Sequence, residues 1–296
     1  EGVDAIPIST APIFHLGVPA ILLGLLSFTL RSIRDRAAEL LVYAVVVFVG
    51  LMGYYLIRQA FNGPDEAFAA VGTYLERGVI TNALLIFGVA LYFLDRQVNR
   101  QSLFACGVGA ALIAIFRLGY FDYLTSSPLV AAHDVGTWPV LNALLLPYGL
   151  PVVWLTLLVQ ALRNRNRAEL VPAVGGAALV SLFAWVSLGV RHYFQGPILN
   201  LPGVTSNEVY AYSAAWLVLG IALLVAGTAW KDKMVRFASL ALMVLTVGKV
   251  FLYDARELEG LLRVASFFGL GLSLLGLSWF YTRYVFAREE PAPAAS

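Results

Sequence analysis

Two copies of the pattern RxxFxGP carry charges that could bind an anion. They are RQAFNGP at residues 58–64 and RHYFQGP at residues 191–197, and each ends an apolar run long enough to cross a bilayer. Arginine and phenylalanine three positions apart share one face of a helix, so together they could hold a phosphate or carboxylate headgroup at a helix end. The candidate binding residues of this pattern are Arg58, Phe61, Arg191, His192 and Phe194.

The same pattern also has a structural interpretation as a helix stop. An arginine in the last turn faces the negative end of the helix dipole, glycine accepts the left-handed conformation of a helix cap, and proline prevents the helix from continuing. The stop residues would be Gly63, Pro64, Gly196 and Pro197. The sequence leaves both interpretations, ligand binding and helix stop, open.

A second repeated pattern places a basic residue five positions before an aspartate. It occurs in FRLGYFD at residues 116–122 and in GKVFLYD at residues 248–254. Five residues rotate a helix by about 140°, so the cation and the carboxylate do not face each other and the cation needs another partner. These further candidates for ligand binding are Arg117, Asp122, Lys249 and Asp254.

Glutamates at matching positions are the preferred partners of the two cations. We expect Glu76 to pair with Arg117, and Glu208 with Lys249, across neighbouring helices. A further expected pair joins Glu259 to Arg263, which lies four residues later in the order that favours a helical salt bridge. These three pairs would be structural.

An enzymatic role for the same residues is the alternative. Asp122 or Asp254 would act as a general base, and arginine or lysine would stabilise the developing negative charge. No nucleophile motif accompanies these carboxylates, and no histidine cluster has the spacing of a metal site. We therefore expect no metal and no cofactor, and a binding function is preferred over catalysis.

The composition is that of an integral membrane protein. Hydrophobic residues make up 60% of the chain and charged residues 13%, with a mean hydropathy of +0.79. The net charge of +2 is too small to indicate a nucleic-acid partner. The single cysteine, Cys106, lies in an apolar segment and excludes a disulfide framework.

Nine apolar windows have the length of a membrane-spanning helix. The predicted fold is thus an all-α integral membrane protein with nine transmembrane helices. The windows are residues 12–30, 38–57, 78–94, 102–121, 139–161, 170–190, 209–230, 236–253 and 261–285.

A shift of 132 residues aligns the chain with itself. The shift places Glu76 on Glu208 and Asp122 on Asp254. The sequence therefore predicts tandem parallel four-helix repeats followed by a final helix. Residues 1–133 would form the first repeat, residues 134–257 the second, and residues 258–296 the ninth helix with a disordered tail.

Basic residues predict the orientation in the membrane. Loops on one side of the predicted helices collect 13 of the 20 lysines and arginines, so this side is expected to be cytoplasmic. The N-terminus of the chain would then be periplasmic, and its C-terminus cytoplasmic. Both RxxFxGP motifs would lie at the periplasmic face.

Three segments of the second half are typical of one protein family: RHYFQGP, EVYAYSAAWLVLGIALLVAG and KVFLYDARELEGLLRVASFFGLGLSLLGL. On these segments the chain resembles the C-terminal region of the large bacterial membrane proteins catalogued as domain of unknown function twenty-three thirty-nine. The resemblance is strong over residues 140–285, and the first half resembles a divergent copy of the same unit. It implies a bacterial inner-membrane setting and a long polytopic protein of which this chain is the last portion. It implies no activity.

From these observations we expect a module that binds, scaffolds or moves an anionic lipid or lipid-linked glycan at the periplasmic face. Its partners would be membrane lipids and either further transmembrane segments of a longer chain or other membrane proteins, with no nucleic acid. The alternative is an integral-membrane transferase or hydrolase that acts at the same face.

Overall fold

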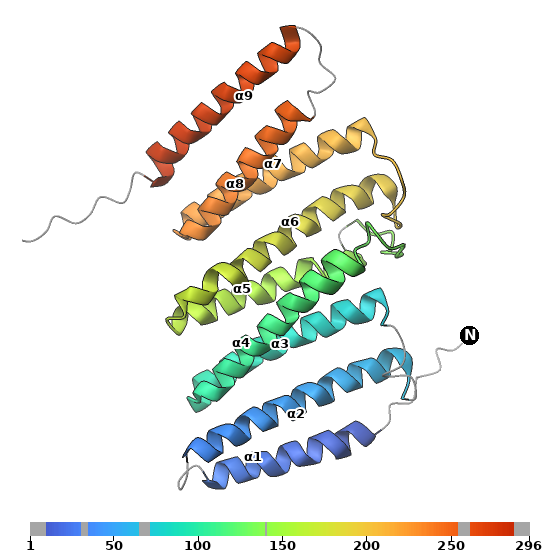
Figure 1. Cartoon of the computed structure of the whole chain (residues 1–296), viewed down its shortest axis with the longest axis vertical. Helices are drawn as coiled ribbons and strands as arrows, with labels where there is room; N and C mark the ends of the chain where they lie inside the picture. The colour runs from blue at the N-terminus through green and yellow to red at the C-terminus, as the bar shows by residue number, and fades with distance from the viewer. Residues whose placement is uncertain (1–9, 31–34, 65–71, 140, 254–260, 287–296) are drawn as a thin grey trace, which may run out of the picture. The chain divides into compact units, whose positions relative to one another are not determined.

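The computed structural model describes residues 10–30, 35–64, 72–139, 141–253 and 261–286, and this part of the chain is helical apart from its loops. Figure 1 shows the order of the helices. They are α1 (Val18–Leu30), α2 (Asp35–Asn62), α3 (Tyr74–Val98), α4 (Gln101–Arg117), α5 (Gly149–Asn164), α6 (Val171–Gln195), α7 (Ser206–Ala229), α8 (Lys233–Leu252) and α9 (Leu261–Phe280). The π-helical turn η1 (Ile13–Gly17) precedes α1, and η2 (Leu118–Thr125) continues α4.

Eight of the described helical segments are long and apolar enough to span a membrane. They run from Ile13–Leu30 to Lys233–Phe251 and correspond to the first eight predicted windows. The all-helical membrane fold is therefore confirmed at this level. A ninth membrane span at α9 stays a prediction, as does the tandem repeat. Asp254, Glu259 and the side chain of Arg263 lie outside the described part of the chain.

The fifth helix differs from its prediction because of proline. Its apolar window begins at residue 139, but α5 begins only at Gly149. The side chain of Asn142 instead caps a short 3₁₀ turn by accepting a hydrogen bond from the Leu144 N–H. Pro147 has no backbone N–H to donate to the carbonyl four residues earlier, so the continuous helix starts beyond this proline.

Polar side chains satisfy the first backbone N–H groups of several helices. Thr73 begins α3 with a capping box, in which its hydroxyl accepts from the Glu76 N–H and the Glu76 carboxylate accepts from the Thr73 N–H. Thr205 accepts from the Glu208 N–H at the start of α7. Asp232 accepts from the Met234 N–H at the start of α8. These caps fix where each helix enters its apolar stretch.

The chain divides into two compact units. Unit 1 contains the residues up to Trp185 together with Pro197–Asn200, and unit 2 contains Val186–Gly196 and the residues from Leu201 onward. The division passes through α6 and does not coincide with the predicted repeat boundary between residues 133 and 134. That boundary describes symmetry in the sequence and stays a prediction.

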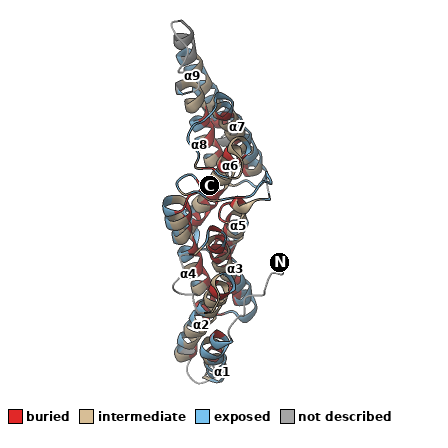
Figure 2. Ribbon diagram, turned by 90° about the vertical axis from the view of Figure 1, so that its right-hand side faces the viewer, coloured by how far each residue is buried: buried red, intermediate tan, exposed pale blue. Residues whose placement is uncertain are grey.

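The core of unit 1 is built around α3, which contacts α2, α4 and α5. More than half of its most apolar window is buried, whereas none of the corresponding window of α2 is. Figure 2 shows buried residues on α3, α4 and α5. The helices α3 and α4 approach each other closely, because a Cβ atom added at Gly88 would lie 2.9 Å from the carbonyl oxygen of Gly107, and the reverse also holds. Such small residues let two membrane helices pack backbone against backbone.

Unit 2 pairs α7 with α8 and packs α9 against α8. Gly227 of α7 approaches the backbone of α8 so closely that a Cβ atom there would lie 2.8 Å from the Arg236 nitrogen. Beyond the end of α9, the buried hydroxyl of Tyr281 lies 2.5 Å from the Ser239 Oγ of α8. One buried hydrogen bond thus ties the last described turn of the chain to α8.

Replacing Gly88 with alanine is expected to destabilise unit 1. The new methyl group would force α3 and α4 apart at a backbone contact, at a cost of about 1–3 kcal/mol. Gly109→Ala on α4 is the matched control, since a Cβ atom there meets nothing within 4 Å. Thermal unfolding in detergent should show a lower Tm for Gly88→Ala than for both wild type and Gly109→Ala. Equal Tm values for the two variants would contradict the close packing.

Candidate functional site

A buried ion pair joins the end of α2 to the start of α3. Arg58 Nη1 donates to Glu76 Oε1 over 2.7 Å, and the side chains are 8% and 0% exposed. Asn62, one turn after Arg58, donates from its amide to the other carboxylate oxygen over 3.1 Å. We call Arg58, Asn62 and Glu76 the α2–α3 clamp.

The same arrangement occurs between α6 and α7. Arg191 Nη1 donates to Glu208 Oε1 over 2.9 Å, and the Gln195 amide donates to Oε2 over 3.1 Å. Arg191 also donates to the backbone carbonyls of Leu201 and Gly203, at 2.5 and 2.9 Å. We call Arg191, Gln195 and Glu208 the α6–α7 clamp.

The clamps change the predicted partners of the two glutamates. The structure pairs Glu76 with Arg58, where we predicted Arg117, and it pairs Glu208 with Arg191, where we predicted Lys249. The physical reason is that the last turn of one helix lies beside the first turn of the next, as the ion pair at each of these helix ends shows. A buried carboxylate therefore finds its cation on the preceding helix.

The remaining residues of the two RxxFxGP motifs differ in exposure and conformation. Phe61 is partly exposed, Phe194 is half-buried and His192 is buried. Gly63 and Gly196 have φ angles of 81° and 76°, in the left-handed region that ends a helix. Pro64 and Pro197 follow directly after these glycines.

A different group of polar residues gathers at the end of unit 1 where α3 begins and α4 ends. We call Tyr74, Arg77, Arg117, Asp122 and His133 the Asp122 cluster. Both guanidinium groups lie over the ring of Phe121, at 6.0 Å for Arg77 and 5.1 Å for Arg117. Both cations are also electrostatic neighbours of the Asp122 carboxylate.

The polar atoms of the Asp122 cluster are poorly satisfied. Asp122 is 1% exposed, and neither of its carboxylate oxygens has a hydrogen-bond partner among the described residues. The same is true of the Tyr74 hydroxyl, Arg117 Nε and His133 Nε2. Buried polar atoms are normally paired, and such a concentration of exceptions is typical of a site that holds water or a ligand.

His133 and Ser126 close this cluster from the loop that follows η2. The His133 ring stacks on Tyr74 with 4.8 Å between ring centroids, and Arg77 donates to the Ser126 hydroxyl. Burial and then the positive charge of Arg77 lower the pKa of His133, against a hydrogen bond to the Ser126 backbone. His133 is therefore neutral at pH 7.

Lys249, the counterpart of Arg117 in unit 2, has neutral oxygen partners. Its ammonium donates to the Val209 carbonyl over 2.8 Å and to the Ser213 hydroxyl over 2.7 Å. It also lies 6.0 Å from the Trp216 ring centroid. Lys249 is thus held against α7, while Asp254, the aspartate of the same sequence pattern, lies outside the described residues.

Five residues of these sites were not predicted from the sequence: Asn62 and Gln195 of the clamps, and Tyr74, Arg77 and His133 of the Asp122 cluster. Asn62 and Gln195 share one signal, an amide one turn after the arginine in both motif copies. Arg77 has no such signal, because its counterpart in the second half is Val209. An arginine in the first turn of an apolar helix, where the dipole disfavours a cation, is the only cue it offers.

Two other features of the described chain bear on chemistry. No three His, Cys, Asp or Glu side chains among the described residues come together as metal ligands.

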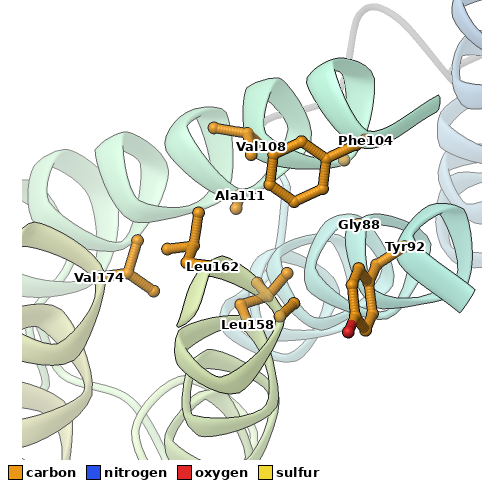
Figure 3. A pocket seen from close by; sticks show the side chains of 10 residues that line it. Gly88, Tyr92, Phe104, Val108, Ala111, Leu158, Leu162 and Val174 are labelled. Atoms are coloured by element: carbon orange, nitrogen blue, oxygen red, sulfur yellow. The ribbon is translucent and has the colours of Figure 1, made fainter. Parts of the chain in front are cut away.

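Figure 3 shows a pocket lined by apolar side chains of α3, α4, α5 and α6, among them Phe104, Leu158 and Val174. With hardly any polar lining, this pocket has nothing to orient a polar substrate.

Replacing Glu76 with glutamine is expected to destabilise unit 1 strongly. The change leaves the Arg58 guanidinium buried without its counter-charge, at a cost of about 3 kcal/mol or more. The control is Glu169→Gln, because Glu169 and Arg167 form an exposed pair worth roughly 0–1 kcal/mol. Unfolding in detergent should separate the two variants clearly. A Glu76→Gln protein as stable as the control would show that the clamp does not hold the helices.

No curated protein and no solved structure matches the chain. A sequence model described as "Predicted membrane protein (DUF2339)" matches residues 4–284, nearly the whole chain. The chain belongs to this family of predicted membrane proteins.

Proposed function

We propose that this chain is a non-enzymatic membrane module that binds, scaffolds or moves an anionic lipid or lipid-linked glycan. The observation that carries the proposal is the pair of guanidiniums, Arg77 and Arg117, over the single ring of Phe121. One carboxylate, Asp122, is near them and hydrogen-bonds to neither. Two cations with one uncommitted carboxylate leave positive charge for an anionic headgroup.

An apolar surface beside Arg117 supports an amphiphile as the ligand. Phe116, Tyr120 and Leu124 are exposed on α4 and η2, and the rings of Phe116 and Tyr120 stack with 5.9 Å between centroids. Aromatic and aliphatic side chains at this level can line an acyl chain while the guanidiniums hold its phosphate. A soluble anion would use only the charged part of this surface.

The arginines of the two RxxFxGP motifs have a different role in this proposal. Arg58 and Arg191 are buried in the clamps, so they hold helices together and do not contact the ligand. The clamps repeat the same set of contacts in both halves of the chain, which supports the predicted tandem repeat. With both repeats parallel, the clamps and the Asp122 cluster would face the periplasm of a bacterial inner membrane.

A transferase or hydrolase at the same face is the second candidate. It would use Asp122 as a general base, and the nearby guanidiniums would stabilise negative charge. The buried carboxylate of Asp122 forms no hydrogen bond with a serine, threonine or cysteine side chain among the described residues. Binding therefore has more support than catalysis. Further transmembrane segments of a longer chain, or other membrane proteins, are the proposed protein partners.

Replacing Arg77 and Arg117 together with glutamine is expected to weaken binding of an anionic lipid. The probe is phosphatidylglycerol, added to the chain in detergent and measured by native mass spectrometry. Loss of two charge-assisted contacts should lower its affinity by about tenfold or more. Arg96→Gln, an exposed arginine at the other end of α3, is the control and should bind as wild type does. Equal affinity for wild type and the double variant would contradict the proposal.

A further inference from the structure

We propose that Asp122 makes this anion site proton-dependent. With a proton on Asp122, the guanidiniums of Arg77 and Arg117 are available to an anionic headgroup; without the proton, the Asp122 carboxylate competes for them. The inference rests on the proposed function and adds the regulation of that same site. It starts from a carboxylate that is 1% exposed and has no described donor to either oxygen.

The geometry of Asp122 suits a neutral acid better than an anion. Burying an ionised carboxylate without donors costs far more than burying a neutral polar group. Two donors are close, yet Arg117 lies over the Phe121 ring and Arg77 donates to the Ser126 hydroxyl. The described arrangement therefore corresponds to Asp122 with its proton bound.

Few groups around Asp122 can change charge near neutral pH. Its neighbours are Tyr74 and Arg77 on α3, Arg117 and Tyr123 on its own segment, and Tyr148 directly before α5. His133 is one contact further away, stacked on Tyr74 and close to Arg77. Tyrosine is neutral and arginine charged throughout this range. Glu76, an electrostatic neighbour of Arg117, is held by the α2–α3 clamp. Asp122 and His133 remain as the groups that a proton could switch.

The Asp122 carboxylate and a headgroup phosphate would compete because both would accept from the same guanidinium donors. Once Asp122 loses its proton, Arg117 Nε, which has no described acceptor, gains a carboxylate acceptor on its own helical segment. A headgroup phosphate needs the same guanidinium face. Binding of the anion and binding of the proton therefore favour each other, and linkage makes this effect reciprocal. Release of the headgroup would return one proton to solvent.

The test measures phosphatidylglycerol affinity of the full chain in nanodiscs between about pH 5 and about pH 9. The phosphodiester of this probe keeps one negative charge over this range. Wild-type affinity should fall by about tenfold as the pH rises, which is a typical coupling between sites. Asp122→Asn, which cannot lose a proton, should keep the low-pH affinity at every pH.

Two further variants make the result specific. Asp122→Glu keeps a titrating carboxylate and should retain a pH-dependent affinity, which excludes a general packing effect of the asparagine. His133→Gln should keep the decrease in affinity with rising pH, whatever its absolute affinity, which excludes the histidine as the switch. The inference is overturned if Asp122→Asn keeps the wild-type pH dependence or if wild-type affinity does not change with pH. If the variant with both Arg77 and Arg117 replaced by glutamine bound phosphatidylglycerol as tightly as wild type does, the proposed function would be overturned instead.

Discussion

The buried pairing of one glutamate with one arginine at each clamp is the constraint on which the hairpins of this protein depend. An apolar environment penalises every unpaired charge, so Glu76 and Glu208 can begin their helices only where a cation meets them. The amide of Asn62 or Gln195 fills the second carboxylate oxygen. Both oxygens of each carboxylate thus accept from the helix before it, and the end of one helix is held to the start of the next.

The two clamps and the Asp122 cluster differ in how their buried polar atoms are hydrogen-bonded. The first unit satisfies the carboxylate of Glu76 completely, yet it leaves Asp122, Tyr74, Arg117 and His133 with unpaired atoms among the described residues. In the second unit, Lys249 finds two oxygen acceptors on α7. Arg117 and Lys249, which the shift of 132 residues aligns, therefore have different hydrogen-bond environments. This difference places the proposed ligand chemistry in unit 1, whereas the clamps serve stability in both.

Sequence patterns were sufficient for the helices and insufficient for the contacts between them. Apolar length predicted eight helices long enough to span a membrane, because the thickness of a bilayer sets that length, and the prediction was wrong at the start of α5, which Pro147 delays. The repeated motifs identified Arg58, Arg117 and Asp122 as unusual. Which cation meets Glu76 depends on how helices are placed side by side, and periodicity carries no such information. Arg77 was missed because no repeat partner marks it.

The most direct test of this account is an experimental map of the full-length protein in a native lipid bilayer, with attention to the space around Phe121. The account predicts both clamps intact and non-protein density, with the shape of a lipid headgroup, within hydrogen-bond distance of the Arg77 and Arg117 guanidiniums. Intact clamps with the two guanidiniums instead paired to protein carboxylates, and no such density, would contradict it.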